Sequence, residues 1–134
     1  MGKEVVFKNG KMTLWFHDDS KIVHHKFHEF IFDKELRDGL KKGLEVMQKT
    51  GADKYLSDDQ DNPVLKKADM EWTASEWRPA MLNTAWKYWA IVKPTKAAGQ
   101  LAMDKIVKEY NDKGVKVQFF SNANAALAWL ENQQ

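Results

Sequence analysis

Four histidines within the first 28 residues are the side chains best suited to binding a metal ion. They are His17, His24, His25 and His28. They lie in a segment rich in β-formers, where side chains four residues apart on one strand are about 13 Å apart, too far to share an ion. His24 and His25 should face opposite sides of a sheet, and His17 would have to reach them across a turn. We therefore expect no metal site here.

An acidic run at residues 58–62, Asp-Asp-Gln-Asp-Asn, is similar to part of a calcium-binding loop. An EF-hand loop counted from Asp58 needs glycine at its sixth position and glutamate at its twelfth, where this chain has Pro63 and Asp69. We therefore interpret the run as a polar turn after a strand. Acid–base catalysis would also need a carboxyl group with a shifted pKa and an orienting partner, and the sequence indicates neither. A hydrolase that uses Asp58 or Asp59 is thus the least favoured hypothesis, and we expect no enzyme.

Four of the six tryptophans of the chain lie within 18 residues. They are Trp72, Trp77, Trp86 and Trp89. We interpret them mainly as core residues. The alternative is a partly exposed aromatic surface that forms a dimer interface or lines an apolar pocket. Trp72 and Trp77 are five residues apart and do not share one face of an α-helix, so at least one of them should approach the surface.

Arg78 is one of only two arginines, the other being Arg37, and the remaining 19 of the 21 cationic residues are lysines. Only these two side chains can therefore hold a carboxylate or phosphate with a planar guanidinium group. We expect Arg78 to form an ion pair with Asp58 or Asp59 of the acidic run. Binding of an anionic ligand by Arg78 is the alternative.

Composition restricts the class of protein. The 134 residues are typical of one domain, and we expect a single domain over residues 1–134. With 43% hydrophobic and 30% charged residues the chain should fold, and a net charge of +2 is too small for a dedicated nucleic-acid-binding protein. The sequence has no cysteine, which excludes disulfides, thiolate nucleophiles, zinc ribbons and cysteine-ligated iron–sulfur clusters. We expect no cofactor.

No segment of the sequence is apolar for long enough to cross a membrane or to direct export. The beginning of the chain lacks the apolar run of a signal peptide. The longest purely apolar stretches are residues 88–92 and 125–130, far shorter than the roughly 20 residues that span a bilayer. We therefore expect a cytoplasmic protein without membrane insertion, which agrees with the lack of cysteine.

The first 50 residues predict a β-meander followed by a helix. Residues 5–7 end at an Asn-Gly turn signal, residues 12–16 form a second run, and a third run from residue 21 to 27 could continue to Phe32. Asp33 then opens a helix that its carboxylate could cap. Apolar residues at helical spacing and a Thr50-Gly51 stop complete the pattern; the apolar residues are Leu36, Leu40, Leu44 and Met47.

The rest of the chain alternates strands and helices. We predict a strand at 53–57, helices near 70–76 and 78–86, a strand at 88–92, a helix at 97–112, a strand at 115–120 and a terminal helix. Asp69 could cap the first of these helices, and Pro79 must kink it or begin the second. The continuous apolar run at 88–92 should be a central strand, buried on both faces.

This order of elements predicts an α/β fold in which the meander forms the antiparallel edge of a sheet and the later strands are parallel, with right-handed crossovers. Open α/β sheets place ligands at the carboxyl ends of their parallel strands. Those ends bring together the acidic run, residues 93–95 and residues 121–122. The candidate ligand or partner site therefore comprises Ser57, Asp58, Asp59, Trp72, Trp77, Arg78, Lys93, Ser121 and Asn122.

An ordered series of patches covers roughly residues 53–130. The patches are Tyr-Leu-Ser-Asp-Asp at 55–59, Glu-Trp at 71–72, Glu-Trp-Arg-Pro-Ala at 76–80, Lys-Tyr-Trp-Ala-Ile-Val-Lys-Pro at 87–94, Val-Gln-Phe-Phe-Ser-Asn at 117–122, Ala-Ala at 125–126 and Ala-Trp-Leu at 128–130. In this order and spacing the chain resembles the STAS/SEC14-type, SpoIIAA-like group of small bacterial domains.

The resemblance implies a STAS-like mixed sheet with four or five helices packed mainly on one face. It also implies a non-enzymatic regulatory domain that acts through protein–protein interaction, with another protein or with a second copy in a homodimer. The SEC14-like relatives imply an alternative, a module that binds a lipid or another small apolar ligand in a pocket near the Trp-rich helical region.

One feature of the anti-sigma-factor antagonist branch is missing from this chain. In that branch a serine in an Asp-Ser-Ser-Gly-like motif is phosphorylated at the start of a helix. The corresponding segment here, residues 66–70, reads Lys-Lys-Ala-Asp-Met, and the sequence contains no Ser-Ser-Gly. We therefore do not assign a phosphorylated residue, and Asp69 is not given that role.

Overall fold

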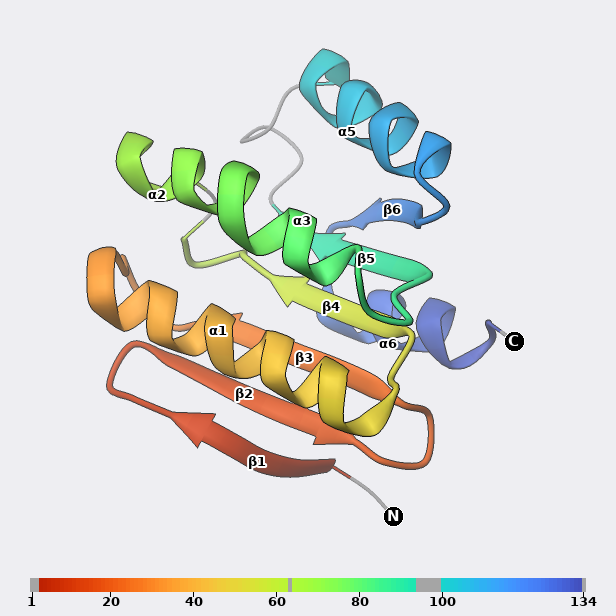
Figure 1. Ribbon diagram of the computed structural model, residues 1–134, viewed down its shortest axis with the longest axis horizontal. Helices are drawn as coiled ribbons and strands as arrows, with labels where there is room; N and C mark the ends of the chain where they lie inside the picture. Colours follow the sequence, from red (N-terminus) through yellow and green to blue (C-terminus); the bar gives the residue numbers. More distant parts are fainter. Residues whose placement is uncertain (1–2, 63, 94–99, 134) are drawn as a thin grey trace.

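The computed structural model describes residues 3–62, 64–93 and 100–133. Its centre is one six-stranded sheet in which the strands lie side by side in chain order, β1 to β6 (Figure 1). The expected strand end at Pro94, the expected site residues 94–95 and the expected helix start at residue 97 lie outside the described residues.

The first three strands form the predicted antiparallel meander. They are β1 (Lys3–Lys8), β2 (Met12–His17) and β3 (Ile22–Phe27), so the third run ends at Phe27 and does not continue to Phe32. The side chain of Asn9 fixes the first turn, since its Oδ1 accepts hydrogen bonds from the backbone N–H groups of Lys11 and Met12.

The other three strands continue the sheet in parallel with β3, which confirms the predicted mixed α/β fold. They are β4 (Lys54–Asp58), β5 (Tyr88–Val92) and β6 (Lys116–Phe120). The strand β5 lies between β4 and β6 and is buried on both faces, as its apolar run predicted, although it is next to the edge strand. An interior strand needs cover on both sides, which is why it carries no alternation.

Helices cover the two faces of the sheet unequally. Because successive parallel strands advance in one direction, crossovers of one hand place their helices on the same face. That face carries α1 (Asp33–Thr50), the helical region at residues 67–81 and α5 (Gln100–Asp112), while α6 (Ala123–Glu131) packs on the opposite face against β4, β5 and β6 (Figure 1).

The start of α1 is capped by a residue that the sequence had placed elsewhere. Asp33 does not cap the helix; its own backbone N–H donates to Oδ2 of Asp69 at 2.9 Å, and Arg37 Nε lies 3.0 Å from Oδ1. Asp69 in turn does not cap the second helical region, since it lies inside that region and is fully buried. A tertiary contact has thus replaced the predicted local cap of α1, and α2 begins at Lys67 without a side-chain cap.

The second helical region is one continuous stretch, and it ends before residue 86. It consists of α2 (Lys67–Trp72), the π-helical turn η1 (Thr73–Trp77) and α3 (Arg78–Met81). Pro79 lies in the first turn of α3, where the sequence predicted that it begins a second helix, but the backbone is helical from α2 through η1 into α3, so the two helices are not separated. A proline ring normally clashes with the carbonyl four residues earlier, here that of Ser75, and the wider π turn gives this carbonyl room.

The end of α1 and the start of α6 agree with the sequence. Gly51 adopts a left-handed conformation with φ 70°, and its N–H donates to the carbonyl of Met47, closing α1. Asn122 caps α6, because its Oδ1 accepts a hydrogen bond from the N–H of Ala125 at 2.8 Å. Among the described residues, no helix is both long enough and apolar enough to pass through a membrane.

Candidate functional site

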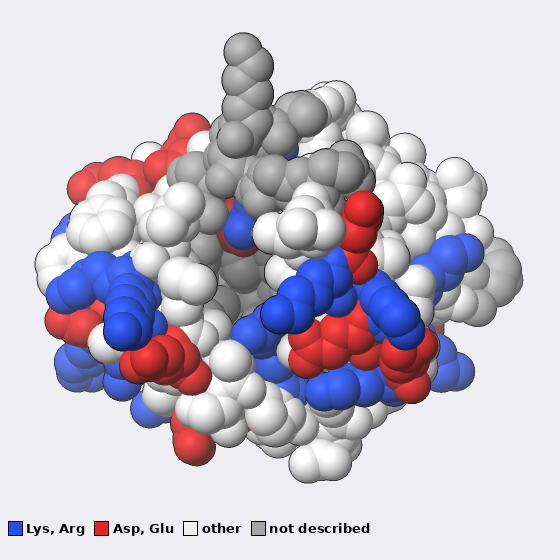
Figure 2. Space-filling view, turned by 90° about the horizontal axis from the view of Figure 1, so that it is seen from above, with Lys and Arg blue, Asp and Glu red and all other residues white. Residues whose placement is uncertain are grey.

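A cavity of about 520 Å³ lies over the carboxyl ends of β4, β5 and β6, between the helical region at 67–81 and α5. Seen from above the helices, this face of the molecule is hollowed near its middle, and charged side chains are visible within the hollow (Figure 2). Most of the lining is apolar, and its charged or titratable members are His25, Asp59, Glu71, Arg78 and Lys93.

The floor of the cavity is one row of side chains across the sheet. His25 on β3 pairs in register with Ser57 on β4, Ser57 with Ile91 on β5, and Ile91 with Phe119 on β6. Residues in register on neighbouring strands point to the same face, so these four side chains all line the cavity. The parallel register therefore brings a histidine, a hydroxyl group and two apolar side chains under one ligand-sized space.

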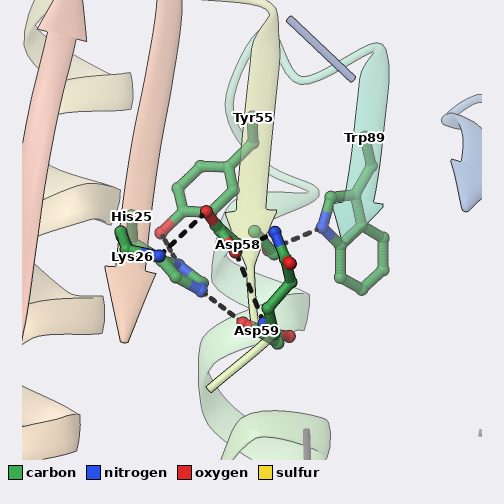
Figure 3. A network of polar contacts seen from close by, with 8 residues as sticks. His25, Lys26, Tyr55, Asp58, Asp59 and Trp89 are labelled. Carbon is green, nitrogen blue, oxygen red and sulfur yellow. Dashed lines mark hydrogen bonds and ion pairs between the residues drawn. The ribbon is translucent and has the colours of Figure 1, made fainter. Parts of the chain in front are cut away.

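His25 is held between two partners at the edge of this floor (Figure 3). Its Nδ1 lies 2.8 Å from the hydroxyl of Tyr55, and its Nε2 lies 2.8 Å from Oδ1 of Asp59. An ionised Asp59 only accepts hydrogen bonds, so Nε2 carries the proton that it receives. In the neutral ring Nδ1 is then the acceptor, and the Tyr55 hydroxyl donates to it. All three groups are satisfied in this arrangement.

Burial shapes the chemistry of this trio. The pKa of Tyr55 is raised well above its usual value, first because the phenol is buried and second because of the negative charge of Asp59. Tyr55 therefore stays protonated and acts as a hydrogen-bond donor. The side chain of His25 is 4% exposed and that of Asp59 17%, so both line the cavity but the aspartate is the more open to solvent.

Asp58 belongs to the other face of the sheet. It is in register with Lys26 on β3, and Lys26 Nζ lies 3.5 Å from its Oδ2 (Figure 3). Successive residues at the end of a strand point in opposite directions, so only Asp59 of the two aspartates lines the cavity. Asp58 and Asp59, which the sequence analysis treated as equivalent, therefore lie on opposite faces of the sheet.

Arg78 does not form the expected ion pair with Asp58 or Asp59 in the part of the chain that the structure describes; those carboxylates contact Lys26 and His25. The guanidinium carbon of Arg78 lies 5.6 Å from the centre of the Tyr110 ring, over the ring of a residue on α5. The Arg78 side chain therefore extends from α3 to α5, on the wall of the cavity.

Trp72 and Trp77 both contact α1, contrary to the expectation that they would face different ways. The Trp72 ring lies 5.4 Å below the guanidinium carbon of Arg37 and 6.0 Å from Lys41 Nζ. Trp77 Nε1 donates to the carbonyl of Leu40 at 2.7 Å. A π turn has more residues per turn than an α-helix, so it brings positions five apart onto one face.

The tryptophans nevertheless divide as predicted between core and surface. Trp77, Trp86 and Trp89 are buried, whereas Trp72 is half-buried beside α1. Trp77 and Trp89 also line the cavity, and Trp89 Nε1 donates to the hydroxyl of Ser57 at 2.9 Å. This hydrogen bond fixes the orientation of the Ser57 side chain within the floor.

Five of the nine predicted site residues line the cavity: Ser57, Asp59, Trp77, Arg78 and Lys93. Asp58 and Trp72 do not, for the reasons given above. Ser121 and Asn122 follow β6 but are exposed at the start of α6, where Asn122 serves as a cap. His25 and Trp89 are missing from the predicted site. The signal that could have found them is the parallel register, which pairs His25 with Ser57 and Trp89 with Tyr55.

The remaining histidines lie away from this cavity. His17 Nε2 is 3.1 Å from His24 Nδ1, and His24 packs beside Trp15. Burial, followed by the neighbouring charges of His17 and His25, lowers the pKa of His24 to about 2. Within the described ranges, no three histidine or carboxylate side chains come together in a way that could hold a metal ion.

No protein-family model matches this sequence, and no match was found among curated proteins or among solved structures. The resemblance to the SpoIIAA-like domains therefore has no support from these comparisons. The function has to be argued from the chemistry of the cavity.

Proposed function

We propose that this chain is a non-enzymatic module that binds a small, mainly apolar ligand in the cavity over β4–β6. The observation that carries the proposal is the cavity itself, whose volume of about 520 Å³ falls in the range of ligand sites. Apolar walls with a few fixed polar groups are typical of such sites, and here His25, Ser57 and Asp59 are held in place by hydrogen bonds.

The polar groups of the floor favour binding over catalysis. Both ring nitrogens of His25 have partners, so neither is free to take a proton from a ligand. The Ser57 hydroxyl accepts from Trp89 and has no hydrogen bond to His25 within the described chain, so it lacks the adjacent base that activates a nucleophilic serine. Asp59 remains as a fixed acceptor for a hydroxyl or amine on the ligand.

The SpoIIAA-like family, with its SEC14-type branch, is the relationship we propose. The sequence patches support it, and so does the order of the elements, a meander followed by alternating helices and parallel strands. We also propose a cytoplasmic location, supported by the lack of cysteine, and no nucleic-acid partner, supported by the net charge of +2.

Native mass spectrometry and calorimetry test the binding function. Protein purified without denaturation should carry an adduct of a few hundred daltons, or should bind the uncharged probe 2-(1-naphthyl)ethanol when titrated. The variant Ala74→Trp places a large ring in the cavity and should abolish binding of the probe. Ala128→Trp makes the same change at an exposed position on α6, across the sheet, and should leave binding intact.

Absence of both the adduct and probe binding in the wild-type protein would contradict the proposal. So would equal binding by the two tryptophan variants, because the probe would then be held elsewhere on the molecule.

Protein binding is the second candidate function, and exposed apolar side chains at the mouth of the cavity favour it. Val64 is 60% exposed and Met70 is 52% exposed, and both line the cavity. A second copy of the chain or another protein could cover them. A dimer in native mass spectrometry that Met70→Glu converts to a monomer would support this function, and a monomer at all concentrations would remove self-association.

A further inference from the structure

We propose that the ligand of the cavity carries a carboxylate and that Arg78 binds it. This inference rests on the proposed binding function and names the chemical class of the ligand: a monocarboxylic acid with an apolar body. Arg78 lies in the wall of an apolar cavity, and its Nε–H donor has no acceptor in the described part of the protein, which points to this class.

The Nε atom of Arg78 is shielded from solvent, and within the described part of the chain it has no hydrogen-bond partner. Leaving a buried donor without an acceptor destabilises a fold, more so when the group is charged. Since Arg78 lines the cavity, an acceptor group on a ligand bound there can supply the missing hydrogen bond.

A carboxylate matches what Arg78 offers. A guanidinium group presents parallel N–H donors in one plane, and a carboxylate accepts them through its two oxygens. The ring of Tyr110, 5.6 Å from the guanidinium carbon, holds the plane of the arginine in position from the side of α5. An arginine supported in this way loses little further freedom when the ligand binds.

The other charged groups of the cavity favour a single negative charge on the ligand. Lys93, at the end of β5, adds a second cation to the lining. Of the two acidic members, Asp59 already accepts a hydrogen bond from His25, and Glu71 is exposed, where solvent screens its charge. The lining therefore offers two cations to a ligand, but its two carboxylates would repel a phosphate dianion more strongly than a monocarboxylate.

The apolar lining defines the rest of the ligand. Trp77, Trp89 and Phe119 present aromatic surfaces, and Ile106 and Met103 of α5 add aliphatic ones. An aliphatic chain and an aromatic ring system both fit such walls. The test therefore has one arm with an aliphatic carboxylic acid and one arm with an aromatic carboxylic acid.

Calorimetric titrations at pH 8 compare each acid with its alcohol of the same skeleton. The aliphatic arm uses decanoic acid and 1-decanol, and the aromatic arm uses 1-naphthylacetic acid and 2-(1-naphthyl)ethanol. In the wild-type protein at least one acid should bind about tenfold more tightly than its alcohol, the usual order of effect for a charge-assisted pair. The arm with the larger ratio identifies the apolar body.

Variants then assign the effect to Arg78. In Arg78→Gln the ratio of the affinity for the acid to that for the alcohol should fall to near one. In Arg78→Lys this ratio should lie between one and the wild-type value, because the charge remains while the planar donors are lost. Lys105→Gln removes a positive charge from an exposed position of α5 outside the cavity and should keep the wild-type ratio. Binding of the alcohol by each variant reports that its cavity is still folded.

The possible results separate the inference from the proposed function. Equal binding of acid and alcohol by the wild-type protein would overturn the carboxylate inference and leave the binding function standing. A ratio that survives in Arg78→Gln would overturn the role of Arg78. If neither acid and neither alcohol bound, the binding function and the inference would both fail.

Discussion

His25 on β3 and Asp59, in the loop after β4, are joined by a hydrogen bond of 2.8 Å between Nε2 and Oδ1. The bond links residues 34 apart in the sequence and orients the one carboxylate of the acidic run that reaches the cavity. On its other side the His25 ring accepts from Tyr55, so the buried phenol, the imidazole and the carboxylate form a chain from the core to the cavity wall. Several consequences of this row of hydrogen bonds and of its surroundings can be measured.

The variants His25→Ala and Tyr55→Phe should be strongly coupled. Removing His25 leaves the fully buried Tyr55 hydroxyl without its acceptor and should lower the free energy of unfolding by about 3 kcal/mol. Removing the hydroxyl as well should recover about 1 kcal/mol, because no unpaired donor then remains. Urea denaturation of the two single variants and the double variant measures this coupling. Additive losses would contradict the hydrogen bond as we describe it.

Gly43→Ala should show the rigidity of Tyr55. A Cβ atom at Gly43 would lie 3.0 Å from the Tyr55 hydroxyl oxygen and 3.3 Å from its Cε2. Because His25 fixes that hydroxyl, the ring cannot move away, and we expect a loss of about 1 kcal/mol in stability despite the better helix propensity of alanine. In a Tyr55→Phe background the same change should be neutral or stabilising. Thermal denaturation compares the two backgrounds, and a stabilised Gly43→Ala variant of the wild type would show that the ring yields.

Asp69→Ala should destabilise the fold by about 3 kcal/mol. The change removes the cap of the Asp33 N–H and a charge-assisted hydrogen bond from Arg37, both to a fully buried carboxylate. Asp112→Ala, which removes an exposed carboxylate paired with Lys108 within α5, is the control and should change stability little. Chemical denaturation measures both. Equal effects of the two substitutions would be inconsistent with capping by Asp69.

Stability should fall with pH below about 6.5 because of His24. Burial and the nearby charges lower its pKa from 6.5 to about 2 in the folded protein, so the folded ring stays neutral while the unfolded ring takes up a proton. The unfolded state then binds more protons, and the free energy of unfolding should decrease by about 2 kcal/mol between pH 7 and pH 5. His24→Leu should remove most of this dependence in urea denaturation. A variant with the wild-type slope would show that other groups cause it.

The sequence predicted most of the framework from local patterns. The Asn-Gly turn, the apolar run at 88–92 and the helical spacing that ends at Gly51 all have the structures expected of them. These features depend on residues close in the chain, which is why periodicity and turn chemistry find them. Five of the nine candidate site residues also line the cavity, because the carboxyl ends of parallel strands meet at one edge of the sheet.

A contact between distant residues and a local change of helical period produced two of the corrections. Asp69 caps a helix that begins 36 residues earlier, and no capping rule based on neighbouring residues can identify it. Trp72 and Trp77 face one helix because a π turn changes the local period, and the sequence around Pro79 allowed either a kink or a second helix.

The sequence by itself determined the α/β class, the order of the elements and the edge of the sheet where a site could form. Only the tertiary structure decided which side chains share that site. Register assigns Asp59 to the cavity and Asp58 to Lys26, and brings His25 beside Ser57. The contact between α3 and α5 leaves Arg78 against Tyr110, without the carboxylate that the sequence had given it. The physical reason is that a strand alternates its side chains between two faces, so the choice of face and partner depends on how strands far apart in the chain align.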